Sequence, residues 1–214
     1  MGRVAELVEA VLEEGSFDTS EDRVLKWLSR RQRLMCSRSR CYRKKLELGP
    51  TVAGQQAYAV PAEALEIREV QVAGVLWGAG RHSDLPQGAQ GWLWLERLLG
   101  SGITTREDSS AGDSLLALYP IPSEAGLTIT AYTVCEPPDL KAGDDTTLVV
   151  PPTMDEALIN AAMATGLLRL EARPDLAAPL EAAFGASCEE LARSTARRFR
   201  GTGPAQIRVV GFNA

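Results

Sequence analysis

The residues of this chain whose types and spacing best suit chemistry form a basic run between residues 30 and 45. The run contains no acidic residue, and its cations are Arg30, Arg31, Arg33, Arg38, Arg40, Arg43, Lys44 and Lys45. Converging cations can neutralise the phosphates of a nucleic acid or pair with an acidic partner surface. If the run is one helix, these side chains spread around its axis. Two interpretations therefore stay open: a basic interface, and an ordinary solvated or salt-bridged face.

The side chains that usually catalyse reactions or bind metals show no pattern that favours either role. His82 is the single histidine, and Asp84 follows it in a polar, glycine-rich stretch. One histidine excludes a multi-histidine metal site, and no GxSxG or phosphate-binding glycine motif is present. The four cysteines match no zinc or redox spacing, so we expect reduced thiols. We therefore expect no enzymatic activity, no bound metal and no cofactor.

Charge is distributed unevenly along the chain of 214 residues, whose net charge is -5. Residues 1–45 hold 11 Lys and Arg against 7 Asp and Glu, so the remainder is strongly acidic. This balance argues against a protein that coats nucleic acid along its whole surface. The N-terminal segment carries acids where an export signal needs an apolar core, and the apolar stretch 157–168 is too short to span a bilayer. We expect no membrane association.

Hydrophobic periodicity predicts helices at both ends of the chain and strands in the middle. Apolar residues recur at helical spacing in 3–14, from about 20 to 40, from 153 onward and in about 176–198. Period-two patterns begin at residue 55. The segregated elements indicate an α+β fold, with a central antiparallel β insertion in a helical bundle and an extended C-terminal tail. The expected parts are a helical body of residues 1–48 and 150–200, a β region of residues 49–149 and an extension of residues 201–214.

Two alternating runs, 115–119 and 127–134, flank a proline-rich turn and predict a β-hairpin. An arm rich in proline, residues 137–152, follows the second run and leads into the third helix.

The C-terminal tail is apolar and prone to form a strand. Its candidate contact residues are Ile207, Arg208, Val209, Val210 and Phe212. They form either an edge strand of the same molecule or a strand that anchors in a neighbouring protein.

Several short motifs occur in a characteristic order. They are Tyr58-Ala59-Val60-Pro61, the run from Leu65 to Val70, Leu116 to Pro122, a strand with Tyr132, Pro137 to Leu140, and Val150-Pro151-Pro152 before an alanine-rich helix. In this order the chain resembles the head-to-tail connector, or adaptor, proteins of tailed bacteriophages, which include the tail tubular protein A of short-tailed phages and the adaptors of siphophages. It departs from them at 109–114, where members usually carry a Gly-Pro-Tyr stretch.

The resemblance implies a structural virion protein in the neck between capsid and tail, assembled in the host cytoplasm. Such proteins form a homo-oligomeric ring, typically of twelve copies, that lies beneath the portal and lets the genome pass. The implied partners are the portal protein, a tail or head-closure protein and, non-specifically, genomic DNA in the channel. Family members often reach into the portal with the C-terminal segment, which makes the tail residues above the candidate portal anchor.

Two other functions remain open from the sequence. The first is a DNA-binding accessory protein that uses a basic helix of residues 30–45, which predicts salt-dependent binding of duplex DNA. The second is an enzyme with an unrecognised site.

Overall fold

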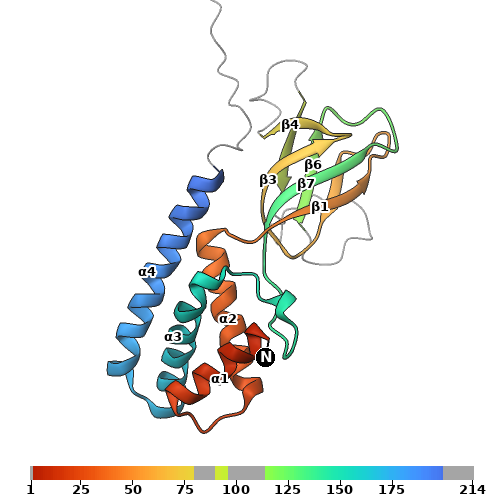
Figure 1. The fold of residues 1–214 in the computed structure, drawn as a ribbon. Helices are drawn as coiled ribbons and strands as arrows, with labels where there is room; N and C mark the ends of the chain where they lie inside the picture. The colour runs from red at the N-terminus through yellow and green to blue at the C-terminus, as the bar shows by residue number, and fades with distance from the viewer. Residues whose placement is uncertain (1, 80–89, 96–113, 200–214) are drawn as a thin grey trace, which may run out of the picture. The chain divides into compact units, whose positions relative to one another are not determined.

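The structure is a computed structural model, and it describes residues 2–79, 90–95 and 114–199. Contacts divide the chain into two units (Figure 1): a helical unit, Met1–Cys41 with Pro137–Ala214, and a β unit, Tyr42–Glu136. The described residues contain four α-helices and a seven-stranded sheet, so the prediction of a mixed α and β fold is confirmed.

The helical unit is built from α1 (Arg3–Gly15), α2 (Glu21–Ser39), α3 (Asp155–Gly166) and α4 (Pro174–Phe199). A π-helical turn, η4 (Leu167–Glu171), follows α3, and two short 3-10 turns precede it, η2 (Asp145–Thr147) and η3 (Pro152–Met154). α3 packs against α1, α2 and α4 (Figure 1), and its alanine side chains allow this close approach. The buried face of α1 carries Val4, Leu7, Val8 and Val11 at helical spacing, as the sequence predicts.

The Phe17 ring packs between α1, α2 and α3. Phe17 meets Trp27 edge to face, with ring centroids 6.0 Å apart. A Cβ placed on Gly166 would lie 2.5 Å from the Phe17 ring, and one placed on Gly15 would lie 2.2 Å from it. These glycines are therefore required by close packing against the ring.

The proline-rich arm after the sheet is held on α2 by buried polar side chains. The Gln32 amide group donates to the carbonyl oxygens of Pro138 (3.3 Å) and Thr147 (3.0 Å) and accepts from the Val149 amide (2.9 Å). Gln32 is fully buried, so these bonds satisfy groups that water does not reach. The Leu140 amide also donates to the Ser29 hydroxyl. The arm is thus part of the helical unit.

The N-terminus of α1 is fixed by acidic residues from a distant part of the sequence. The Asp145 carboxylate accepts hydrogen bonds from the amides of Arg3 and Val4, both at 2.9 Å. These amides lower the pKa of Asp145, since they stabilise the ionised form. The Arg3 side chain forms an ion pair with Asp155 and donates to the Val150 carbonyl oxygen.

The β unit is one sheet in the order β1-β7-β3-β4-β5-β6-β2. The strands are β1 (Arg43–Pro50), β2 (Ala57–Val60), β3 (Ala64–Val72), β4 (Val75–Ala79), β5 (Gly91–Leu95), β6 (Ser114–Tyr119) and β7 (Thr128–Cys135). The β3–β4 connection is a two-residue turn in which Ala73 and Gly74 both take positive φ.

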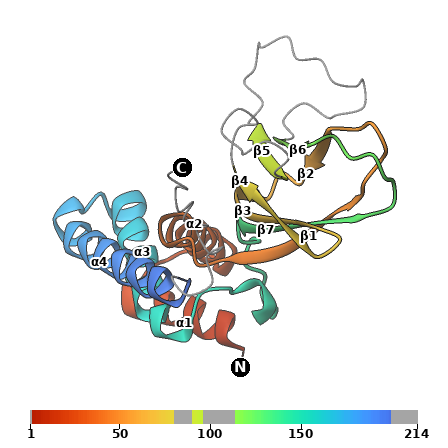
Figure 2. The same cartoon turned by 90° about the horizontal axis from the view of Figure 1, so that it is seen from above.

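Side chains from all the strands meet in one core, around which the sheet curls (Figure 2). The core includes Tyr58 of β2, Val70 of β3, Trp77 of β4 and Leu116 of β6, while Leu46 of β1 packs against it. The Trp92 indole of β5 donates a 3.0 Å hydrogen bond to the Trp77 carbonyl oxygen, which satisfies a polar group at the edge of this core.

The β unit differs from the prediction in three respects. The predicted hairpin is wrong: β6 pairs with β2 and β5, whereas β7 pairs with β1 and β3. Pro120 and Pro122 lack amide hydrogens, so the ladder does not continue through the segment between these strands. β4 and β5 pair in parallel over two residue pairs, so the sheet is not wholly antiparallel. Residues 43–48, expected in the helical body, belong to β1.

Candidate functional site

The basic run is divided between the two units instead of forming one helix. Arg30, Arg31, Arg33 and Arg38 lie on α2, which ends where Arg40 takes a positive φ of 53° and its amide donates to the Cys36 carbonyl oxygen. Arg43, Lys44 and Lys45 lie on β1 in the β unit. The expected basic helix of residues 30–45 is therefore wrong. Alternating apolar residues, Leu46 and Leu48, make the end of the run a strand.

On β1, Lys44 is engaged by neighbours in the β unit. Its ammonium group lies 3.1 Å from the Glu63 carboxylate and 5.3 Å from the centre of the Tyr42 ring. Burial lowers the pKa of Lys44, but the interactions with Glu63 and Tyr42 outweigh it and raise the pKa. This cation is used in an internal contact at the surface of the sheet.

On α2, two of the predicted interface residues are also committed to internal contacts. The Arg33 guanidinium group lies 2.8 Å from the Asp139 carboxylate. The Arg31 guanidinium group forms an ion pair with Glu181, donates to the Thr165 hydroxyl (2.8 and 3.0 Å), and lies 5.6 Å from the centre of the Phe184 ring. These contacts join α2 to α3 and α4, so Arg31 has a structural role.

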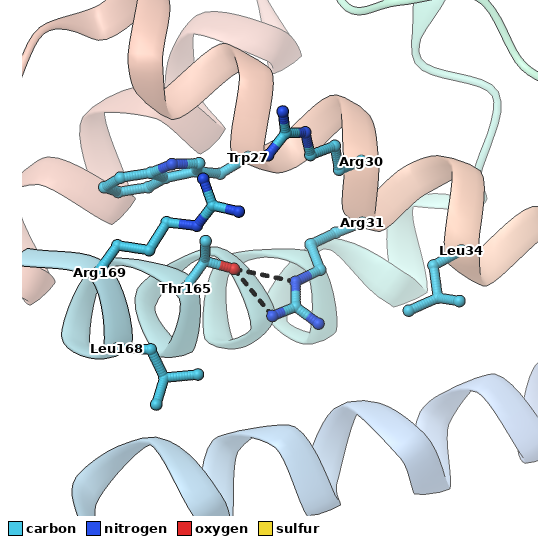
Figure 3. Close-up of a pocket in the computed structure, with 7 residues that line it drawn as sticks. All are labelled: Trp27, Arg30, Arg31, Leu34, Thr165, Leu168 and Arg169. Carbon is cyan, nitrogen blue, oxygen red and sulfur yellow. Dashed lines mark hydrogen bonds between the residues drawn. The ribbon is translucent and has the colours of Figure 1, made fainter. Parts of the chain in front are cut away.

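A groove of about 290 Å³ opens beside Arg31 in the helical unit. It is lined by Trp27, Arg30, Arg31 and Leu34 of α2, Thr165 of α3, and Leu168 and Arg169 of the π-helical turn. Figure 3 shows Arg31 turned toward Thr165, while the guanidinium groups of Arg30 and Arg169 lie toward the Trp27 end. We call these seven residues the arginine groove.

Arg30 and Arg169 differ from Arg31 in how they are used. Both are exposed, and neither forms an ion pair within the described part of the chain. The groove thus combines an apolar lining with two cations that no internal carboxylate neutralises, which is chemistry suited to an acidic partner. The sequence gives only a weak signal for Arg169, a single cation in the leucine-rich segment Leu167–Glu171, and nothing that pairs it with Arg30.

The thiols near α2 are poorly suited to nucleophilic chemistry. The sulfur atoms of Cys36 and Cys41 are 3.6 Å apart. The hydrogen bond from Cys41 and burial raise the pKa of the Cys36 thiol above its usual range. Burial also raises the pKa of Cys188. Thiolates are disfavoured at both positions, and the thiolate is the reactive form.

Comparison with protein families connects these features to a known group of proteins. The sequence matches the model of the SU10 adaptor protein family over residues 3–208, which is nearly the whole chain. The chain belongs to the SU10 adaptor protein family. No curated protein matches the sequence. Membership of this family confirms the resemblance to bacteriophage head-to-tail adaptors.

Two sets of predicted residues in this SU10-family adaptor lie outside the described residues. They are the candidate anchor, Ile207, Arg208, Val209, Val210 and Phe212, and the lone histidine, His82 with Asp84. Within the described ranges, no group of three or more His, Cys, Asp or Glu side chains is placed to hold a metal ion. No helix in those ranges is long and apolar enough to cross a membrane.

Proposed function

We propose that this SU10-family adaptor is a structural, non-enzymatic virion protein that forms a ring beneath the portal. The ring connects the capsid to the tail and lets the genome pass through its lumen. The observation that carries this proposal is the family match over residues 3–208. A closed ring needs heterologous contacts, in which each copy presents two different faces to its neighbours.

In the proposed arrangement the chain is a helical bundle with a β insertion and an extended C-terminal tail. The helical unit forms the body of a ring of twelve copies beside the portal, and the β unit faces the tail or head-closure protein. The tail residues Ile207, Arg208, Val209, Val210 and Phe212 reach into the portal as its anchor. The protein assembles in the host cytoplasm and resides in the virion neck. The division of contacts into a helical and a β unit supports the two-part design.

Contact with DNA in this proposal is non-specific and limited to genome in the channel. The net charge of -5 disfavours adhesion to a polyanion that has to slide. A DNA-binding accessory protein was the competing hypothesis, and it relied on one basic helix of residues 30–45. Because α2 ends at Ser39 and β1 begins at Arg43, that helix is absent and the adaptor proposal is the better supported.

The proposal is tested by locating the protein in particles. A tagged copy is expressed during infection, virions are purified, and the neck is reconstructed by electron microscopy with untagged virions as the control. We expect density for this chain as a ring between portal and tail. A protein that is absent from purified virions, or recovered only with free DNA, contradicts the proposal.

A further inference from the structure

The arginine groove already shows how it accommodates a carboxylate. Glu181 binds the Arg31 guanidinium group through both of its oxygens at the side of the groove. Such two-point pairing is the geometry in which guanidinium groups bind carboxylates best. Arg30 and Arg169 carry the same group on the same groove and lack an ion pair within the described chain. The groove is therefore suited to further carboxylates from outside the molecule.

The groove also presents apolar surface. Leu168 is 45% exposed, although it is a large aliphatic side chain, and Leu34 lines the same groove half-buried. Figure 3 shows both leucines apart from the guanidinium groups of Arg30 and Arg169, so the groove offers apolar and cationic surface side by side, as protein interfaces with a charged rim do. The phosphate backbone of a nucleic acid does not use such aliphatic surface.

A carboxylate-rich helix face is available on the same chain. All seven acids of residues 1–45 precede residue 23, and all are exposed: Glu6, Glu9, Glu13, Glu14, Asp18, Glu21 and Asp22. Glu6, Glu9 and Glu13 follow one another at spacings of three and four on α1, which places them on one stripe. Like charges at these spacings repel, and none of the three has an ion pair among the described residues.

The acidic stripe of Glu6, Glu9 and Glu13 and the arginine groove are separate surfaces of the helical unit. The apolar residues of α1 face inward, so the stripe faces outward, and no residue of α1 lines the groove. The two charge patterns are complementary but unsatisfied among the described residues of one molecule. A helix face laid in a groove is a common mode of recognition between proteins.

We propose that the arginine groove binds the acidic stripe of a second copy of this chain. The contact is heterologous because one copy gives its groove and the other gives its helix, so it repeats around a ring. This inference rests on the proposed ring and names the contact that closes it. Arg30 and Arg169 bind Glu9 and Glu13 of the neighbour, and Leu168, on another side of the groove, adds apolar contact.

The test uses two neutralised variants of the full chain. The groove variant carries Arg30→Gln and Arg169→Gln and keeps its acidic stripe; the stripe variant carries Glu9→Gln and Glu13→Gln and keeps its groove. Self-association is measured by analytical ultracentrifugation over a concentration series at low and high salt. Wild type is expected to form oligomers that weaken with salt. Each variant alone is expected to associate at least about tenfold more weakly.

Mixing separates this contact from a general loss of charge. The groove variant still offers a stripe, and the stripe variant still offers a groove, so an equimolar mixture is expected to form dimers without longer oligomers. A chain with Arg23→Gln and Lys26→Gln, at exposed positions of α2 outside the groove, is the matched control and is expected to associate like wild type.

Three results overturn the inference. They are a wild-type chain that stays monomeric throughout, oligomers unchanged in both variants, and salt-dependent binding of duplex DNA that Arg30→Gln and Arg169→Gln remove. The location of the protein in virions is measured separately, so a ring in the neck together with any of these results rejects the contact while keeping the proposed function.

Discussion

The arginine groove of the helical unit and the basic strand β1 of the β unit draw on the same basic run, yet the chain uses them differently. On β1, Lys44 is paired with Glu63 and lies over Tyr42. On the groove, Arg31 is paired internally while Arg30 and Arg169 stay exposed without an ion pair in the described chain. A local excess of charge thus does not define a site. A candidate binding site is defined by the cations that line a groove and have no internal carboxylate partner.

Removing the paired arginine of the groove gives the largest expected loss of stability. Arg31→Met deletes the contacts to Glu181, Thr165 and Phe184 and leaves the carboxylate without its partner. We expect the free energy of unfolding to fall by about 2–4 kcal/mol, measured by urea denaturation. Removing the orphaned carboxylate with Glu181→Leu in the Arg31→Met background should recover part of the loss. If Arg31→Met alone is as stable as wild type, the contacts of Arg31 with α3 and α4 do not stabilise the helical unit.

The second-largest loss of stability is expected from a larger side chain at Gly166, next to the Phe17 ring. Gly166→Ala brings a methyl group against the Phe17 ring that supports Trp27, and we expect a loss of about 1–3 kcal/mol in urea denaturation. Gly185→Ala is the matched control, since a Cβ at this position within α4 meets nothing within 4 Å among the described residues. That control should be neutral or gain up to about 1 kcal/mol. Equal effects at both glycines would exclude Phe17 as the cause.

Removing the paired cation of β1 is expected to matter less than removing Arg31. The Lys44–Glu63 pair has side chains 36% and 41% exposed, so Lys44→Met should cost less than about 1 kcal/mol in urea denaturation. The effect should also shrink in high salt, because exposed charges are screened. A loss as large as that of Arg31→Met would remove the distinction between the two regions.

The smallest expected effect is that of Asp145 on the pH dependence of stability. Because the folded pKa of Asp145 is lowered, its contribution is present above the unfolded carboxyl pKa and is lost as pH falls through the folded value. The difference in free energy of unfolding between wild type and Asp145→Asn should therefore shrink below about pH 4. Thermal melts of both proteins over a pH series, recorded at dilute concentration, measure this difference.

Periodicity predicted the helices because each is amphipathic over many residues, as the apolar face of α1 with Val4, Leu7 and Val11 illustrates. It located most strands but not their partners: alternation in 115–119 and 127–134 identifies two strands, while their neighbours are chosen by distant segments. β1 was missed because its start, Arg43 to Lys45, continued the charge of α2. The groove was beyond prediction, since Arg30 and Arg169 are brought together only by the packing of α2 on the end of α3.

Copies of this adaptor are proposed to join by placing α1 of one in the arginine groove of the next. A reconstruction of the virion neck by electron microscopy, at a resolution that shows side chains, would reveal this contact directly. We expect a ring in which Glu9 and Glu13 of each copy meet Arg30 and Arg169 of its neighbour. A ring whose grooves are empty, or filled by DNA or by another protein, would contradict the proposed contact.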